Sequence, residues 1–332
     1  MRRGSIGIDL SAAVLAFVAI VALAELTHSK ALVDFVIRLS AIGIFATSLN
    51  LLVGYTGMVS FGHGMFFASG AYVFGLLMQK AGVSIPVAFV LTLACSAALA
   101  AVVGAICARL NEIYFAVLTL AFQMLLYSLI VSWVGFTGGD QGLTGGIPRP
   151  VFLGVNLANQ RHLYIGSAAL LIASLVAMRH LTRSPFGYTL RMIRDNPTRA
   201  SFLGVRVWRV RVIAFVVAGT FGAIGGIIMS LFVSAAYPEF AYWTTSGEAI
   251  FAIMMGGMDL FLGPLVGSCA LLLLNDVVTK FTEHYGLALG IMVLAFALGF
   301  RKGLADFFVE AAGALRRRRE ARRGVAPQGG AG

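Results

Sequence analysis

Long runs of apolar residues, repeated along the chain, constrain its fold most strongly. Runs of more than roughly 18 apolar residues are the hydropathy signature of helices that cross a lipid bilayer. Of the 332 residues, 59% are hydrophobic and only 12% are charged, which excludes a soluble globular domain. We therefore predict an all-α fold, a polytopic transmembrane helical bundle of about ten membrane segments that include short or broken helices. The segments are Ile8–Leu26, Phe35–Val53, Met65–Met78, Pro86–Ala108, Ile113–Val134, Leu163–Met178, Val212–Val233, Glu248–Gly257, Leu260–Val278 and Leu287–Phe300.

The positive charges are divided unevenly between the two sides of this bundle. Most of the 25 lysines and arginines fall on the side that carries both ends of the chain, in a central block at 179–211 and in a second block after Gly299. Positive residues favour the cytoplasmic side, so we expect a multi-pass inner-membrane protein with both termini in the cytoplasm. Because these blocks lie beside apolar segments, we expect the lipid bilayer as a partner and no nucleic acid.

The two ends of the chain carry further predictions. Met1-Arg2-Arg3, the first apolar run and Ala22-Leu23-Ala24 together resemble a signal peptide with a small-residue cleavage site. The apolar run is long for a signal peptide, so an uncleaved membrane span is favoured. We assign residues 1–315 to one transmembrane domain and residues 316–332 to a basic, disordered cytoplasmic tail.

The central basic segment, 179–211, combines eight arginines with signals of local structure. Asn196-Pro197 is typical of a helix N-cap followed by proline at the first helical position, and a left-handed Gly204 is suited to end that helix. We predict a short capped helix that docks on a cytoplasmic partner. The alternative is a plain topology anchor, but an anchor needs arginines and no capped helix. The candidate docking residues are Arg194, Asp195, Asn196, Ala200 and Gly204.

Two glycine-rich stretches, 54–64 and 256–264, interrupt segments that are short for crossing a bilayer. Irregular backbone at membrane depth is tolerated only where it is buried in protein or lines a wet cavity. Interrupted segments in both halves of a membrane protein therefore point to a translocation path. The alternative is that the glycines serve close helix packing, and both interpretations can hold together. The predicted path residues are Gly54, Gly57, Ser60, Gly62, His63, Gly64, Gly256 and Gly257.

Several kinds of chemistry are missing from the sequence. No glycine is directly followed by lysine, so a Walker A motif is absent, and no catalytic set or metal-spaced cluster is visible. We expect no enzyme activity, no cofactor and no metal. A lone histidine such as His63 is more often packed than catalytic. The apolar segments carry no acid or base near their predicted centres, which lowers the case for an ion-coupled carrier. Energy for transport would then come from a separate cytoplasmic ATPase.

Several stretches closely resemble the branched-chain amino-acid permease family of ATP-binding-cassette importers, and in particular its LivM-type membrane subunit. The likeness extends over nearly the whole chain and distinguishes the permease class better than it distinguishes the cargo. The stretches are SLNLLVGYTGMVSFGHGMFFASGAY (Ser48–Tyr72), IYFAVLTLAF (Ile113–Phe122), TGGDQGLTGGIP (Thr137–Pro148) and RSPFGYTLRMIRDNPTRASFLGV (Arg183–Val205).

This resemblance implies a permease subunit that works with a sister membrane subunit, two cytoplasmic ATPase subunits and a periplasmic substrate-binding protein. The family's ATPase-docking loop carries a Glu-Ala-Ala-x-x-x-Gly pattern. Only Ala200 and Gly204 match it here, because Thr198 stands in place of the glutamate. The implied cargo is leucine, isoleucine or valine. Urea or short-amide permeases are the alternative within the class, and a self-sufficient secondary carrier is the alternative from another class.

Overall fold

The computed structural model describes residues 13–19, 22, 29–149, 157–281, 286–287 and 290–291. Most of the first and last predicted segments and all of the tail lie outside these residues. Within them the fold is helical, with one isolated β-bridge between Leu143 and Ala236, which confirms the predicted all-α class. The elements are α2 (Lys30–Thr56), α3 (Gly64–Leu76), the π-helical turn η1 (Leu77–Ala81), α4 (Ile85–Cys107), α5 (Glu112–Ser132), α6 (Val134–Thr137), the 3-10 turn η2 (Gly139–Gln141), α7 (Gln160–Arg183), α8 (Pro185–Asp195), α9 (Pro197–Phe202), α10 (Val207–Val233), the 3-10 turn η3 (Pro238–Ala241), α11 (Trp243–Gly256) and α12 (Gly263–Phe281).

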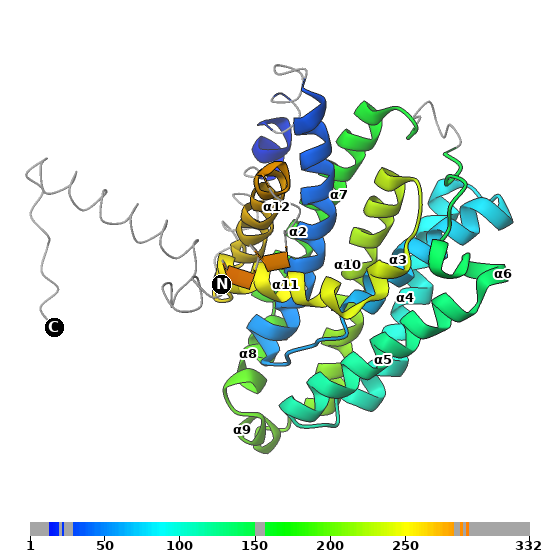
Figure 1. The fold of residues 1–332 in the computed structure, drawn as a ribbon. Coiled ribbons are helices and arrows are strands. Elements are labelled where there is room, and N and C mark those ends of the chain that lie inside the picture. Colours follow the sequence, from blue (N-terminus) through cyan, green and yellow to red (C-terminus); the bar gives the residue numbers. More distant parts are fainter. Residues whose placement is uncertain are drawn as a thin grey trace, which may run out of the picture.

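Two helices, α2 and α10, form the centre of the bundle (Figure 1). They pack against each other, and around them lie α3, α4, α7 and α12. A β-carbon on Gly226 of α10 would lie 1.9 Å from the carbonyl oxygen of Phe67, and one on Gly225 would lie 2.5 Å from that of Ala41. Such contacts are possible only for glycine, so the α10 glycines let α2 and α3 approach backbone to backbone.

Five of the described helices are long and apolar enough to cross a membrane, namely α2, α4, α5, α7 and α10. Their positions agree with predicted segments, although α2, α7 and α10 extend beyond them. The remaining predicted segments that the structure describes are the shorter helices α3, α11 and α12. Figure 1 shows α11 lying across α2, whereas α12 runs along it.

The central basic segment differs from the loop that its composition suggests. α7 continues to Arg183, a further helix follows from Pro185 to Asp195, and α10 begins at Val207. The sequence analysis missed α8, although its apolar residues recur at helical spacing: Gly187, Leu190 and Ile193 are buried. α8 and α9 lie together at one end of the bundle (Figure 1).

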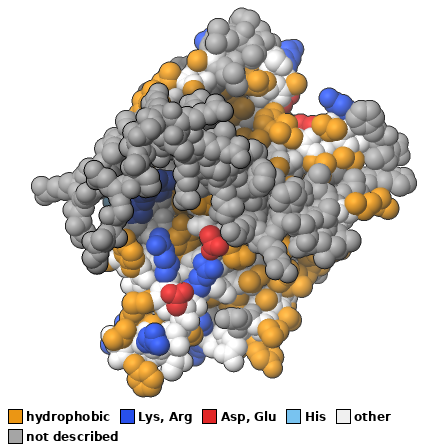
Figure 2. All heavy atoms as spheres, turned by 90° about the vertical axis from the view of Figure 1, so that its left-hand side faces the viewer, with side chains coloured by type: hydrophobic (Ala, Val, Ile, Leu, Met, Phe, Trp, Pro, Cys, Tyr) orange, Lys and Arg blue, Asp and Glu red, His pale blue; other side chains and the backbone are white. Residues whose placement is uncertain are grey.

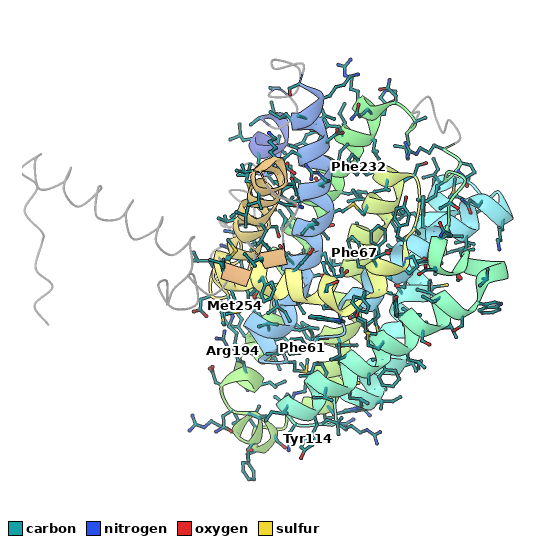
Figure 3. All side chains as sticks on the ribbon, in the orientation of Figure 1. Phe61, Phe67, Tyr114, Arg194, Phe232 and Met254 are labelled. Carbon is teal, nitrogen blue, oxygen red and sulfur yellow. The ribbon has the colours of Figure 1, made fainter. Side chains whose placement is uncertain are left out.

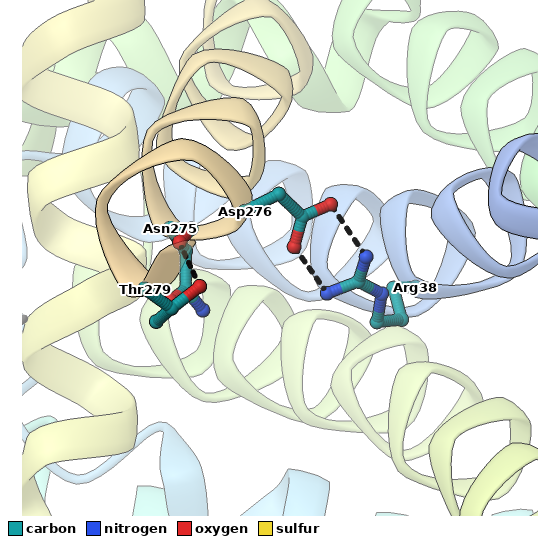
Figure 4. A network of polar contacts seen from close by, with 4 residues as sticks. All are labelled: Arg38, Asn275, Asp276 and Thr279. Carbon is teal, nitrogen blue, oxygen red and sulfur yellow. Dashed lines mark hydrogen bonds and ion pairs between the residues drawn. The ribbon is translucent and has the colours of Figure 1, made fainter. Parts of the chain in front are cut away.

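An ion pair joins α2 to α12 (Figure 4). The Arg38 guanidinium donates to both carboxylate oxygens of Asp276, over 2.9 Å from Nη1 to Oδ1 and 2.7 Å from Nη2 to Oδ2. Two parallel charge-assisted hydrogen bonds lower the cost of placing both ions inside helices of a membrane protein. This pairing could not be predicted from the sequence, because the two residues stand far apart in the chain.

Candidate functional site

The first glycine break ends the most buried of the long helices. α2 stops at Thr56, and Gly57 takes a left-handed conformation with φ of 73°. No regular secondary structure follows until a turn leads into α3 at Gly64. A left-handed φ costs glycine little because it carries no β-carbon. The predicted interruption of the helix is confirmed, whereas its role in a path stays a prediction.

The second glycine break separates α11 from α12. α11 ends at Gly256, Gly257 has φ of 96°, and α12 begins at Gly263. A β-carbon on Gly256 would lie 1.8 Å from the carbonyl oxygen of Gly263, and one on Gly267 would lie 1.8 Å from that of Ala252. Here the packing interpretation of the glycines is confirmed, because only glycine lets these two helices meet so closely.

The two breaks, far apart in sequence, touch each other at the end of α2. The side-chain amide of Asn50 donates to the carbonyl oxygen of Met258 over 3.3 Å. A β-carbon on Gly54 would lie 2.8 Å from that same oxygen. Close packing therefore also explains Gly54, and the structure brings both predicted groups of path residues together.

A second contact joins the start of α3 to the start of α11. The backbone N–H of Gly64, at the start of α3, donates to Ser246 Oγ in the first turn of α11 over 2.7 Å. Ser246 Oγ donates to Gln123 Oε1 over 2.7 Å, and Gln123 Nε2 donates to the carbonyl oxygen of Tyr242 over 2.7 Å. Gln123 lies at the middle of α5, a helix able to cross a membrane, so α3 and α11 both start near mid-depth.

Gly62 and Gly64 lie where the close approach of α5 leaves no space for a side chain. A β-carbon on Gly62 would lie 2.1 Å from the carbonyl oxygen of Thr119, and one on Gly64 would lie 2.7 Å from Gln123 Nε2. These two glycines therefore hold α3 against α5. A polar Gln123 inside an apolar segment was the sequence signal that could have located this contact, because polar groups at membrane depth need a partner.

His63 is packed inside the first break, as a lone histidine usually is. It is fully buried, its Nε2 lies 2.9 Å from Ser48 Oγ, and its ring stacks on Phe45 and meets the edge of Phe66. Several neighbouring polar atoms are buried without a hydrogen-bond partner among the described residues. They are Thr47 Oγ1, Asn50 Oδ1, Ser60 Oγ and His63 Nδ1.

Arg194, the last arginine of α8, reaches both breaks. Its Nη1 donates to the carbonyl oxygen of Gly54, and its Nη2 lies 3.4 Å from Asp259 Oδ1. A β-carbon on Gly57 would contact Arg194 Cγ at 3.4 Å. Arg194, Phe61 and Met254 lie in the same region of the bundle (Figure 3), and basic and acidic side chains gather on the lower part of this face (Figure 2). Arg194 thus contacts its own chain, and its predicted docking role stays a prediction.

The short helix α9 has the predicted caps. Asn196 Oδ1 accepts the backbone N–H of Arg199 over 2.8 Å, and Pro197 occupies the first helical position. At the other end, Gly204 has φ of 84°, and the N–H of Val205 donates to the carbonyl oxygen of Ala200. This is the left-handed helix end that the sequence predicted.

The exposed side chains of α9 differ from the predicted docking set. Ala200 is buried, so its side chain supports the helix from inside, while Asp195, Asn196 and Gly204 lie exposed. The exposed large apolar residues of this segment are Phe202 at 87% and Leu203 at 68%. The sequence analysis did not single out these two, although large apolar residues beside a charged segment were a visible signal.

The two breaks touch each other, and so do the starts of α3 and α11. Interrupted helices that meet in this way inside a bundle of apolar spans are typical of membrane transport proteins. Within the described ranges, no group of three or more His, Cys, Asp or Glu side chains is placed to hold a metal ion. The site combines hydroxyl, amide and backbone groups with the His63 imidazole and the charged side chains of Arg194 and Asp259. Such groups can form hydrogen bonds with a polar solute.

The chain belongs to the family described as the permease component of branched-chain amino acid transport systems, whose family model matches residues 31–306. It is 26% identical over 275 residues to the high-affinity branched-chain amino acid transport system permease protein LivM of Salmonella typhimurium. That alignment covers 76% of this chain and 64% of LivM. The alignment thus spans somewhat less than two thirds of the relative's length.

Other relatives are permeases named for different solutes. The chain is 30% identical over 199 residues to the autoinducer 2 import system permease protein LsrC of Salmonella paratyphi B, covering 56% of this chain and 52% of LsrC. It is 30% identical over 73 residues to the guanosine ABC transporter permease protein NupQ of Bacillus subtilis, covering 22% of each chain. No solved structure gives a significant match.

Proposed function

We propose that this chain is the transmembrane permease subunit of an ATP-binding-cassette importer for branched-chain amino acids in a bacterial inner membrane. It pairs with a sister membrane subunit, and two cytoplasmic ATPase subunits act on the end that carries α8 and α9. A periplasmic binding protein delivers the cargo to the opposite side. The chain itself supplies the path and binds no nucleotide.

The observation that carries this proposal is the double contact of Arg194. Its guanidinium binds the carbonyl end of α2 at Gly54 and reaches Asp259 in the second break. A displacement of α8 and α9 would therefore act on both breaks at once. This is the connection that an importer driven from the cytoplasm requires, because the energy-using subunits lie outside the membrane.

We further propose that α9 docks in a groove of the ATPase through Phe202 and Leu203. Both side chains are largely exposed at the tip of a helix whose caps hold its shape. Large exposed apolar side chains with charged neighbours are typical of protein interaction sites. Asp195, Asn196 and Gly204 would form the rim of this contact, with Ala200 supporting it from inside.

The region around the first break is our candidate for the fixed wall of the path. Ser60 Oγ and His63 Nδ1 are buried there without hydrogen-bond partners among the described residues. Buried unpaired polar groups are costly, and functional sites are where they persist. In a second conformation, with Gly54, Gly57, Gly62, Gly64, Gly256 and Gly257 acting as pivots or close-packing points, these groups would meet water or cargo.

The cargo assignment follows LivM, whose alignment covers more of this chain than those of LsrC and NupQ. The LivM alignment spans 76% of this chain, against 56% for LsrC and 22% for NupQ. The names of the latter two show that permeases related to this chain serve other solutes. Urea or a short amide remains the alternative cargo of the same class.

An uptake assay separates these functions. The chain alone, and the chain co-expressed with its sister subunit, ATPases and binding protein, are tested for leucine, urea and acetamide uptake. We expect leucine uptake only by the full set, and only with ATP. Uptake by the chain alone along an ion gradient would identify a secondary carrier, and uptake of urea or acetamide in place of leucine would overturn the cargo.

A substitution at Gly204 tests the docking role of α9. A β-branched residue at φ of 84° is strained, by about 1–3 kcal/mol, so Gly204→Val should distort the end of α9. Nothing lies within 4 Å of a β-carbon there, so no span is disturbed. We expect normal insertion, poor co-purification of the ATPase and loss of uptake. If the ATPase co-purifies at the wild-type level and ATP hydrolysis is normal, the segment is only a topology anchor.

A further inference from the structure

Glu248 is an acidic side chain at an unexpected depth. It lies on α11, only two residues beyond Ser246, which is bonded to Gln123 at the middle of α5. The sequence analysis placed Glu248 at the beginning of an apolar segment and counted no acid near the centre of any span. The structure corrects this, because the start of α11 is itself near mid-depth. Glu248 is exposed and has no hydrogen bond or ion pair with the described part of the chain.

A carboxylate at this depth does not face hydrocarbon without a large cost. Ionisable groups inside membrane segments face a bundle interior, a wet cavity or an opposite charge, and they commonly mark a transport path. Asp276 in α12 follows this rule through its bidentate pair with Arg38. Glu248 has no such pair among the described residues, which leaves its carboxylate available to a cation from another molecule.

The surface beside Glu248 is apolar apart from the exposed Thr244, one turn before it, and has room for a small side chain. Trp243, Gly247 and Met254 recur at helical spacing along one face of α11, and their neighbour Glu248 borders that face. Trp243 is 50% exposed and Met254 is 48% exposed. A β-carbon on Gly247 would meet no heavy atom within 4 Å, in contrast to Gly256 of the same helix. Met254 is visible on α11 in Figure 3.

We propose that Glu248 binds the ammonium group of the transported amino acid, and that Trp243, Gly247 and Met254 form the surface for its aliphatic side chain. A carboxylate beside an apolar stripe matches the two ends of such a cargo. This assignment rests on the proposed function, since it requires a cargo with an ammonium group. A basic residue of the sister subunit is the competing source of positive charge.

The test uses the full complex with its binding protein, reconstituted in vesicles, and labelled L-leucine as the probe. Glu248→Gln keeps the size of the side chain and removes its charge. We expect leucine import to fall at least about tenfold, because a hydrogen bond to a charged group is lost. Glu248→Asp should recover part of the import. Hydrolysis of ATP stimulated by the loaded binding protein should stay within about twofold of wild type, so that more ATP is spent per leucine imported.

Two further variants make the outcome decisive. Asp140→Asn removes an exposed carboxylate in the η2 turn and should leave import unchanged. Gly247→Leu fills the open space without a backbone clash and should also reduce import. If wild type imports leucine and Glu248→Gln does so equally well, the Glu248 site is wrong while the proposed function stands. Loss of the sister subunit from Glu248→Gln would overturn the site in favour of an interface ion pair. If wild type imports no leucine, the proposed cargo fails, and the ammonium site fails with it.

Discussion

The two glycine breaks look alike in sequence, yet they occupy different environments. In the first break Met58, Ser60 and His63 are almost entirely buried. In the second break Met258 is 39% exposed and the Asp259 side chain is 72% exposed. The first is enclosed by α2, α5, α10 and the start of α11, while the second has packing partners chiefly in α2 and α12.

This difference separates a fixed part of the site from a part that is free to move. Segments with few buried contacts open at lower cost than segments in a packed core. We therefore infer that the second break changes conformation more readily than the first. Arg194 touches both, through the carbonyl of Gly54 and the carboxylate of Asp259, and we propose that it transmits movement between them.

The largest expected effect comes from adding one methyl group inside the first break. Gly62→Ala would place a β-carbon 2.1 Å from the carbonyl oxygen of Thr119, where neither backbone can yield. We expect a loss of roughly 3 kcal/mol or more of stability and little folded protein in the membrane. Gly166→Ala is the control, since a β-carbon there meets nothing within 4 Å. Folded Gly62→Ala at wild-type levels would show that the first break is not fixed.

One methionine in each break allows the difference in packing between the two breaks to be measured directly. Met58 is 3% exposed, so Met58→Ala should cost about 2–4 kcal/mol through the cavity that it leaves. Met258 is 39% exposed, so Met258→Ala should cost less than about 1 kcal/mol. Thermal unfolding of the two purified variants in detergent gives the comparison. Equal losses of stability would remove the distinction between the breaks.

Removing the side chain that joins the breaks should affect transport more than folding. Arg194→Ala frees the carbonyl of Gly54 and the carboxylate of Asp259. We expect leucine import by the full complex to fall about tenfold, as for loss of a charged hydrogen bond, while ATP hydrolysis continues. Arg209→Ala, an exposed arginine of α10 near the same end of the bundle, should change neither quantity. Import by Arg194→Ala at the level of Arg209→Ala would contradict the coupling role.

The smallest effect is expected at the exposed partner of Arg194. Asp259 is largely solvated and its contact measures 3.4 Å, so the pair contributes at most about 1 kcal/mol. Asp259→Asn should lower import by no more than about twofold at moderate salt, because the bond from Arg194 to Gly54 remains. A loss as large as that of Arg194→Ala would mean that the second break alone carries the coupling.

Much of the architecture could be predicted because its signals are local. A span is recognisable from its own apolar residues, and the caps of α9 from Asn196, Pro197 and Gly204. The amphipathic helix α8 was not predicted. The segment was interpreted from its arginines, and the helical spacing of Leu190 and Ile193 was overlooked. The burial of Ala200 could not be predicted, since sequence spacing does not reveal which face of a six-residue helix is buried.

By itself, the sequence determined the helical membrane class, the position of both breaks and the shape of the capped helix, because each depends on residues near one another in the chain. Only the tertiary structure decided that Gly54 meets Met258, that Gly64, Ser246 and Gln123 share hydrogen bonds, and that Glu248 lies near mid-depth. These contacts join residues far apart in the chain. They form because buried polar groups must find partners and because only glycine lets the backbones approach closely enough to provide them.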